Sequence, residues 1–170
     1  MKKIISFLIL TFCMLALLSV GASAVTLETE ITAGESSVNV GIESEWTITI
    51  TICSDGEDLE SVVVQGGIGA DLVVTDPGVQ GVTLTKQGKG KMGATIVKWD
   101  IGTLAANNCL DLDLVVTTRL NPNGKQEFTS AEEGHELDGG FSATYWFDGT
   151  EYETEETMPL TVNVVGLEEE

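Results

Sequence analysis

Apolar and polar positions alternate in short runs from Val25 onward, and Gly, Asp, Asn and Pro residues separate these runs. The clearest run spans 46–52, where Trp46 and three isoleucines occupy one set of alternate positions and three threonines the other. A period of two is typical of a β-strand with one buried face. No window places apolar residues at i, i+3, i+4 and i+7 over three turns, so the pattern predicts strands and not helices.

Further runs of this kind predict strands along the rest of the chain. Asp148-Gly149 lies between two of them and is a strong signal for a tight hairpin turn. Many short strands at close spacing are typical of two packed antiparallel sheets, because one hairpin could not bury so many large side chains. The chain is therefore expected to be an all-β antiparallel sandwich, with strands at 46–52, 59–64, 71–75, 82–85, 95–101, 110–116, 142–147, 150–155 and 158–165.

The first 24 residues have the organisation of an export signal. Lys2 and Lys3 form a basic start, 4–20 is an uncharged apolar run, and Ala22-Ser23-Ala24 supplies the small residues of a cleavage site. We expect a signal peptide helix at 1–24 that is cleaved after Ala24, leaving 25–170 as one domain without a membrane span. A retained membrane anchor is the alternative, although the apolar run is short for a bilayer span.

Composition narrows the function classes. The chain has 27 Asp and Glu against 8 Lys and Arg, a net charge of −19, yet its mean hydropathy is +0.17. Removing residues 1–24 would take away two lysines and no acidic residue, leaving six Lys and Arg against 27 Asp and Glu, a charge of −21. Nucleic-acid binding is disfavoured because phosphate neutralisation needs clustered Lys and Arg. Disorder is disfavoured because 42% of the residues are hydrophobic.

Two segments resemble a known family. The first is the strand-turn-strand run from Trp46 through Asp55-Gly56 to 59–64. The second, from Trp99 to Leu104 with the strand 110–116, resembles a Trp-x-Ile-Gly-x-Leu signature. The family is the prokaryotic cell-surface conserved repeat domain of unknown function. The resemblance implies an immunoglobulin-like β-sandwich, best matched over 38–118 with a C-terminal hairpin extension at 119–170, and it carries over no catalytic residue.

The residues of this signature also have a physical interpretation. Large apolar side chains at alternate positions favour burial, so we assign Trp46, Trp99, Ile101 and Leu104 to the core. Gly102 permits a positive φ or a close backbone approach after the strand.

Cys53 and Cys109 are an even pair of cysteines in a chain expected to be exported, which suggests a disulfide. Cys53 is in phase with the threonines of its strand, and Cys109 with Asp111 and Asp113, so both lie off the core face. A bond at one pole of the sandwich, where one strand ends and the other begins, is the expected arrangement. Two free thiols are the alternative.

Acidic residues are the other candidate chemistry. Asp55, Glu57 and Asp58 share one loop and are weak candidates for Ca²⁺, the only cofactor that the sequence suggests, although their spacing matches no EF-hand. Solvated surface is the simpler interpretation of these residues, as it is for Asp111 and Asp113, for which nothing suggests the cleft of a glycosidase.

Two further groups have residue types that occur in functional sites. The only histidine, His135, lies in a polar stretch and is expected to be exposed and inert, because no nucleophile or metal-ligand spacing accompanies it. The run 88–91 contains two glycines and two lysines but lacks the spacing of a phosphate-binding loop.

The hairpin 145–152 is the main candidate surface. A two-residue turn places Tyr145 opposite Tyr152 on one face and Trp146 opposite Glu151 on the other. If the tyrosine face is buried, Trp146 is exposed beside a carboxylate, which suits sugar stacking or a partner contact; burial of Trp146 under a neighbouring strand is the alternative. Trp146 and Tyr152 are the ligand-contact candidates.

We therefore expect a secreted or cell-envelope protein that is not an enzyme and acts as a structural or adhesion module. Its expected partners are envelope or extracellular proteins, including a second copy of itself. A carbohydrate-binding module that uses the exposed aromatics of the hairpin is the alternative.

Overall fold

The computed structural model describes residues 24–87, 94–120, 123 and 128–166. Twelve strands account for the regular structure of this part of the chain, and none of its segments is a helix long and apolar enough to cross a membrane. The predicted signal peptide helix, apart from Ala24, and the run 88–91 lie outside the described residues.

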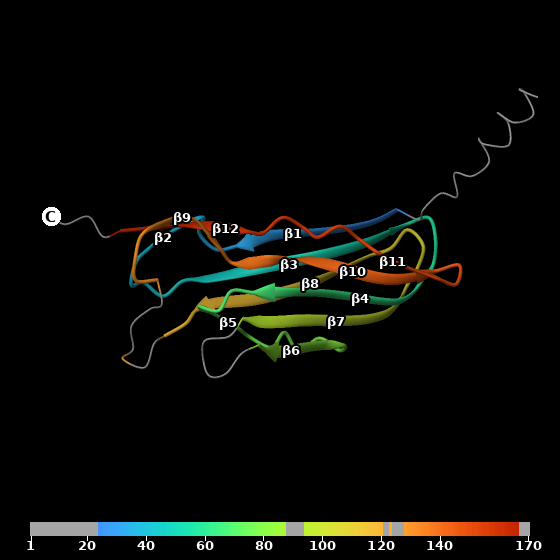
Figure 1. Cartoon of the computed structure of the whole chain (residues 1–170), viewed down its shortest axis with the longest axis horizontal. Helices are drawn as coiled ribbons and strands as arrows, with labels where there is room; N and C mark the ends of the chain where they lie inside the picture. Colours follow the sequence, from blue (N-terminus) through green and yellow to red (C-terminus); the bar gives the residue numbers. More distant parts are fainter. Residues whose placement is uncertain (1–23, 88–93, 121–122, 124–127, 167–170) are drawn as a thin grey trace, which may run out of the picture.

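Three sheets are present, and their strands run largely along the long axis of the molecule (Figure 1). The first sheet has the order β1-β3-β8-β5, with β1 (Ala24–Ala33), β3 (Glu45–Asp55), β8 (Cys109–Thr118) and β5 (Leu72–Val74). The second has the order β11-β10-β4-β7-β6, with β11 (Thr150–Glu153), β10 (Asp138–Phe147), β4 (Leu59–Ile68), β7 (Thr95–Leu104) and β6 (Val82–Lys86). A small third sheet has the order β2-β12-β9, with β2 (Ser37–Asn39), β12 (Thr161–Val165) and β9 (Glu132–Glu136).

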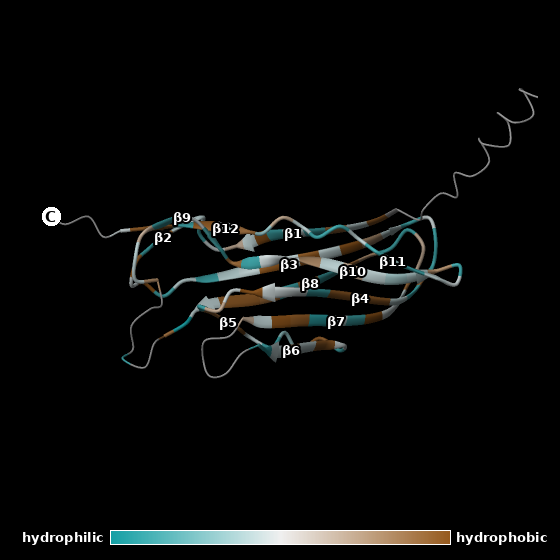
Figure 2. Cartoon of the chain, viewed as in Figure 1, coloured by the Kyte–Doolittle hydropathy of each residue, from teal (hydrophilic) through white to brown (hydrophobic). Residues whose placement is uncertain are grey.

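The two large sheets enclose one hydrophobic core, to which alternate residues of both contribute (Figure 2). Ile48 and Ile50 of β3 and Leu112 of β8 are fully buried, while Thr51 and Asp111, on the opposite faces of the same strands, reach the surface. All paired strands are antiparallel except β2 and β12. The prediction of an all-β, antiparallel immunoglobulin-like sandwich is confirmed.

Three strands were not predicted, and each has a weak pattern. β1 alternates correctly, but Glu28 and Glu30 lie at its outward positions and its inward positions are only half-buried. β9 has no apolar residue at all, and β2 is three residues long. These short strands form the third sheet because β12 lies between them and pairs with β2 on one side and β9 on the other.

Candidate functional site

The predicted core residues lie as expected, with one local change of phase. Trp46 is fully buried and its indole Nε1 donates to the Glu35 carbonyl at 2.8 Å. Trp99 and Leu104 are buried, whereas Ile101 is half-buried. The change comes from a β-bulge opposite β4 where Gly102 adopts φ +77°, so two outward positions follow each other before Leu104 turns inward. The glycine therefore supplies a positive φ, and no other atom crowds its position.

Cys53 and Cys109 form a disulfide. They are directly opposite each other in the register of β3 and β8, with a Cα–Cα distance of 4.1 Å. The bond lies off the core face, as the alternation predicted, and joins the last part of β3 to the first residue of β8. It closes a chain segment of 56 residues and fixes the centre of the first sheet, to which β1 is attached.

The acidic loop between β3 and β4 does not gather its carboxylates. Asp55, Glu57 and Asp58 are exposed, and Asp58 Oδ1 accepts a hydrogen bond from the Ala106 backbone N–H at 2.8 Å. In the part of the chain that the structure describes, no three His, Cys, Asp or Glu residues come together in a way that could hold a metal ion. The Asp58 carboxylate has a structural role, because it ties this loop to the turn that precedes β8.

Asp111 and Asp113 are held by the neighbouring strand. Thr51 Oγ1 donates to Asp111 at 2.7 Å, and Thr49 Oγ1 donates to Asp113 at 2.6 Å. Both carboxylates are on the outer face of the first sheet, and neither lines the groove beside β1 or the hollow beside Trp146 in the described part of the chain. Their contacts are those of an outer-face polar ladder across β3 and β8.

The hairpin of β10 and β11 has the predicted register, with Tyr145 opposite Tyr152 and Trp146 opposite Glu151. The two tyrosine rings stack with centroids 5.7 Å apart, and Tyr145 is buried in the core. Burial, with a smaller contribution from Tyr152, raises the pKa of the Tyr145 hydroxyl. Trp146 is on the opposite face and is 43% exposed. The two ligand-contact candidates, Trp146 and Tyr152, are therefore on opposite faces and do not form one platform.

The exposed indole of Trp146 has acidic neighbours on both sides. β10 lies between β11 and β4, so Trp146 is flanked by Glu151 on one side and Glu60 on the other. It lines a hollow of about 300 Å³ with Asp58, Glu60 and the turn residues of the hairpin. An aromatic face bordered by carboxylates can pack against a sugar ring or an apolar stem and can attract a cationic group.

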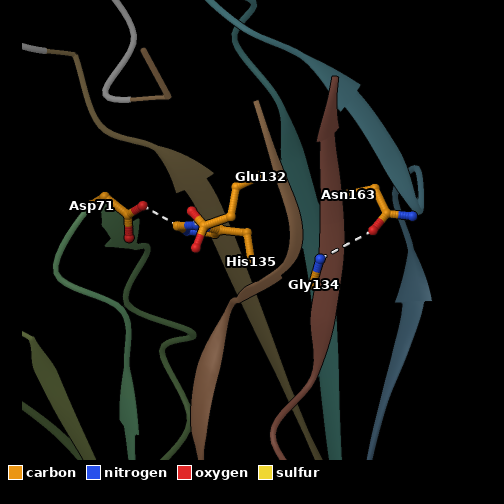
Figure 3. A network of polar contacts seen from close by, with 5 residues as sticks. All are labelled: Asp71, Glu132, Gly134, His135 and Asn163. Atoms are coloured by element: carbon orange, nitrogen blue, oxygen red, sulfur yellow. Dashed lines mark hydrogen bonds and ion pairs between the residues drawn. The ribbon is translucent and has the colours of Figure 1, made fainter. Parts of the chain in front are cut away.

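His135 differs from the expectation of an exposed residue in a loop. It lies in β9, its side chain is 17% exposed, and its ring packs edge-on against Phe128 at a centroid distance of 4.6 Å. Figure 3 shows the ring between two carboxylates: Nε2 is 2.7 Å from Asp71 Oδ2 and Nδ1 is 2.9 Å from Glu132 Oε2. No local pattern indicates this arrangement, because Asp71 is far from His135 along the chain and the tertiary fold brings them together.

The same close-up shows how β9 is held in place. The Gly134 backbone N–H donates to Asn163 Oδ1 of β12 at 3.1 Å (Figure 3). His135 and Gly134 together attach the third sheet to the turn before β5 and to its own central strand. A neighbouring hollow that Glu132 and Asn163 help to line does not include His135 or Asp71. The cluster is therefore a structural junction.

Two further buried charged groups lie near this junction. Arg119 Nη2 donates to the Leu72 carbonyl at 3.1 Å. Asp138 is 1% exposed, and its Oδ1 accepts from the backbone N–H groups of Gly140 and Leu160 at 3.2 and 3.0 Å, while its Oδ2 has no partner among the described residues. Burial raises the pKa of the Asp138 carboxyl above its ordinary value, against the lowering effect of these two hydrogen bonds.

The free edge of β1 is a feature that the sequence pattern did not reveal. β1 is the outermost strand of the first sheet, and no backbone hydrogen bond from the described residues reaches its outer side. The connection from β11 to β12 runs beside it (Figure 1), and the two enclose a groove of about 470 Å³ lined by Leu27, Thr29, Met158 and Leu160 among others. The alternation of 27–31 was the signal that could have identified this edge strand.

No protein-family model and no curated protein matches this chain. The resemblance to the conserved repeat domain therefore stays a prediction from the sequence.

Several solved structures are similar at low identity. A family 20 exo-β-N-acetylglucosaminidase from Vibrio harveyi is 13% identical, with 86% of this chain and 20% of the enzyme covered and a TM-score of 0.45. A cohesin module from a Clostridium perfringens family 33 glycoside hydrolase is 13% identical over 84% of this chain and 99% of the module, with a TM-score of 0.45. The major pilin subunit of Bacillus cereus is 12% identical over 84% of this chain and 40% of the pilin, with a TM-score of 0.46. This chain spans about a fifth of the length of the Vibrio enzyme, and at these identities no residue role is transferred.

Proposed function

We propose that this chain is a non-enzymatic interaction module of the cell surface or extracellular space, which acts by contact with other proteins. The observation that carries the proposal is Trp146, a large aromatic side chain that is 43% exposed on a regular strand and lines a hollow. Tryptophan is enriched among the residues that dominate binding energy in protein interfaces. The disulfide and the predicted export signal at 1–24 support an oxidising compartment outside the cytoplasm.

The test is binding of the intact protein to an envelope fraction, compared with Trp146→Ala. We expect the variant to lose at least tenfold in affinity, because truncation of a central aromatic in an interface costs about 2 kcal/mol or more. Val79→Ala is the matched control, since Val79 is also 43% exposed but lies outside the hollow. Equal losses in both variants, or no loss in either, would contradict the proposed role of Trp146.

Carbohydrate binding is a second candidate, because Glu60 and Glu151 lie beside the indole and their carboxylates could accept hydrogen bonds from sugar hydroxyls. Tyr152 does not support it, because its ring faces Tyr145 on the other side of the hairpin. A glycan array probed with the wild type and Trp146→Ala separates the two candidates. Sugar binding that depends on Trp146 would replace protein contact as the function, whereas an empty array with envelope binding retained supports the first proposal.

A further inference from the structure

The outer edge of β1 has backbone groups that are free to pair with another strand. Ser54 N–H donates to Asn108 O, so Ser54 bonds towards β8 and its neighbour Cys53 bonds towards β1, where it is opposite Thr26. The backbone groups of successive residues point to opposite edges of a strand, so those of Thr26, Glu28 and Glu30 form hydrogen bonds with β3. The N–H and C=O groups of the residues between them, Val25, Leu27, Thr29 and Ile31, point to the free edge of β1, away from β3.

The opposite side of the groove does not satisfy these groups. Among the described residues, the segment from Thr157 to Leu160 makes one hydrogen bond with β1, from Thr29 Oγ1 to Thr157 Oγ1 at 3.2 Å. Its side chains leave apolar surface open, since Met158 is 84% exposed. An extended segment in this groove would pair with the free backbone groups of β1 and cover Leu27 and Met158, which is the geometry of strand addition.

The charged residues of the first sheet indicate which kind of segment would bind at the β1 edge. No Lys or Arg lies in β1, β3, β8 or β5, and all cations of the strands that the structure describes, Lys86 and Lys98, belong to the second sheet. Glu28 and Glu30 are exposed at successive outward positions of β1. A strand added beside them would place alternate side chains opposite these carboxylates, where opposite charges stabilise and like charges destabilise.

The same rule disfavours a second copy of this chain. Consider two copies of β1 paired antiparallel through the backbone groups of their free edges. The registers with the greatest overlap place Glu28 of one copy opposite Glu28 or Glu30 of the other. Self-pairing therefore opposes carboxylates at the middle of the strand.

We propose that the β1 edge is a binding site for an extended segment of a basic partner protein, with Lys or Arg at alternate positions facing Glu28 and Glu30 and apolar residues facing the groove. The segment adds to the first sheet as an antiparallel or parallel fifth strand next to β1. This binding site rests on the proposed interaction role and gives it a partner chemistry, on a surface that does not include Trp146.

The probe is a short end-capped peptide of alternating lysine and valine, added to the intact protein and followed by NMR. We expect binding that weakens as salt rises, together with slower hydrogen exchange of the outward amides of Leu27 and Thr29. A peptide with glutamate in place of lysine, and one with proline at its central valine, should not bind. Binding without protection of these two amides would overturn the proposal.

Two pairs of protein variants, each a test with its control, separate the contribution of the backbone from that of the charges. Thr29→Pro removes one outward N–H, which proline tolerates at a strand edge, and should abolish binding, while Thr29→Val keeps the N–H and should bind. Glu28→Gln/Glu30→Gln should weaken binding about tenfold, from two cross-strand ion pairs. Glu153→Gln/Glu155→Gln makes the same charge change away from the groove and should leave binding unchanged.

Two further outcomes of the same experiments would contradict the proposed binding site at β1. Equal affinity of the two glutamine variants, or concentration-dependent protection of Leu27 and Thr29 without peptide, would overturn the proposal, the latter in favour of a second copy. Loss of envelope binding in Trp146→Ala concerns the other surface, so the two proposals fail separately.

Discussion

β1 and β10 lie on the same side of the sandwich, one in each large sheet, and they differ in whether the backbone groups on their outer side have hydrogen-bond partners. The edge of β10 is closed: β11 pairs with its C-terminal half, and beyond β11 the Thr154 and Thr157 N–H groups donate to the carbonyls of Ala143 and Phe141. The Oγ1 atoms of these two threonines accept from the N–H groups of the same residues at 3.0 Å. By contrast, the described residues give the outer edge of β1 one hydrogen bond, between the side chains of Thr29 and Thr157.

The difference shows that the connection from β11 to β12 acts as a partner strand for one edge only. The side chains of Thr154 and Thr157 accept from β10 where the connection leaves regular strand geometry, so the N–H groups of Ala143 and Phe141 keep their acceptors. The open edge of β1 is protected from unspecific pairing by Glu28 and Glu30, since charged residues discourage edge-to-edge association. The outer side of β10 is therefore part of the folded structure, whereas the edge of β1 is open to the basic segment that we propose.

The largest expected effect comes from breaking the sheet that carries the open edge. Cys53→Ser/Cys109→Ser removes the bond between β3 and β8, and a closed segment of 56 residues predicts a loss of about 4 kcal/mol in the free energy of unfolding. Urea unfolding of the wild type and the variant measures it. An equal loss on adding reductant to the wild type is the control, and a change below about 1 kcal/mol would contradict the assigned role.

Opening the closed edge should have the next largest effect. Thr154→Val/Thr157→Val keeps the side-chain shape but leaves the N–H groups of Ala143 and Phe141 without their acceptors, at a cost of about 1 to 2 kcal/mol each. Hydrogen exchange of these two amides should become faster. Thr29→Val is the matched control at β1 and should change stability by less than about 1 kcal/mol. Comparable effects at the two edges would remove the contrast between them.

The smallest effect concerns Asp138, which anchors the start of β10. Its pKa is raised in the folded state by burial, so folding takes up a proton when the pH lies between the unfolded and folded pKa values. Asp138 therefore lowers stability as pH rises through that window, which begins near the ordinary aspartate pKa of 3.8, and the cost is complete once the pH exceeds the folded-state pKa. Asp138→Asn keeps an oxygen for Gly140 and Leu160 and removes the charge.

We expect Asp138→Asn to be at least as stable as the wild type at neutral pH and to lose this part of the pH dependence. Thermal unfolding across the acidic range measures both. Lower stability at neutral pH with an unchanged pH profile would show that the carboxylate is paired in solution.

Local pattern was sufficient for the elements that bury large side chains. The faces of β3 and β8, the register of the hairpin at Asp148-Gly149 and the off-core position of both cysteines follow from a period of two and from turn geometry. Exposure of Trp146 followed once Tyr145 was buried, because the two are adjacent in one strand.

The sequence by itself determined which faces are buried, because burial repeats with the side-chain period along each strand. Only the tertiary structure decided which edges are paired, because pairing depends on segments distant in the chain. It places Thr154 and Thr157 beside β10 and His135 beside Asp71, and among the described residues it gives the outer edge of β1 no backbone hydrogen-bond partner. The basic partner segment that we propose is inferred from that last difference, since a strand with unpaired hydrogen-bonding groups and fixed charges can select its partner.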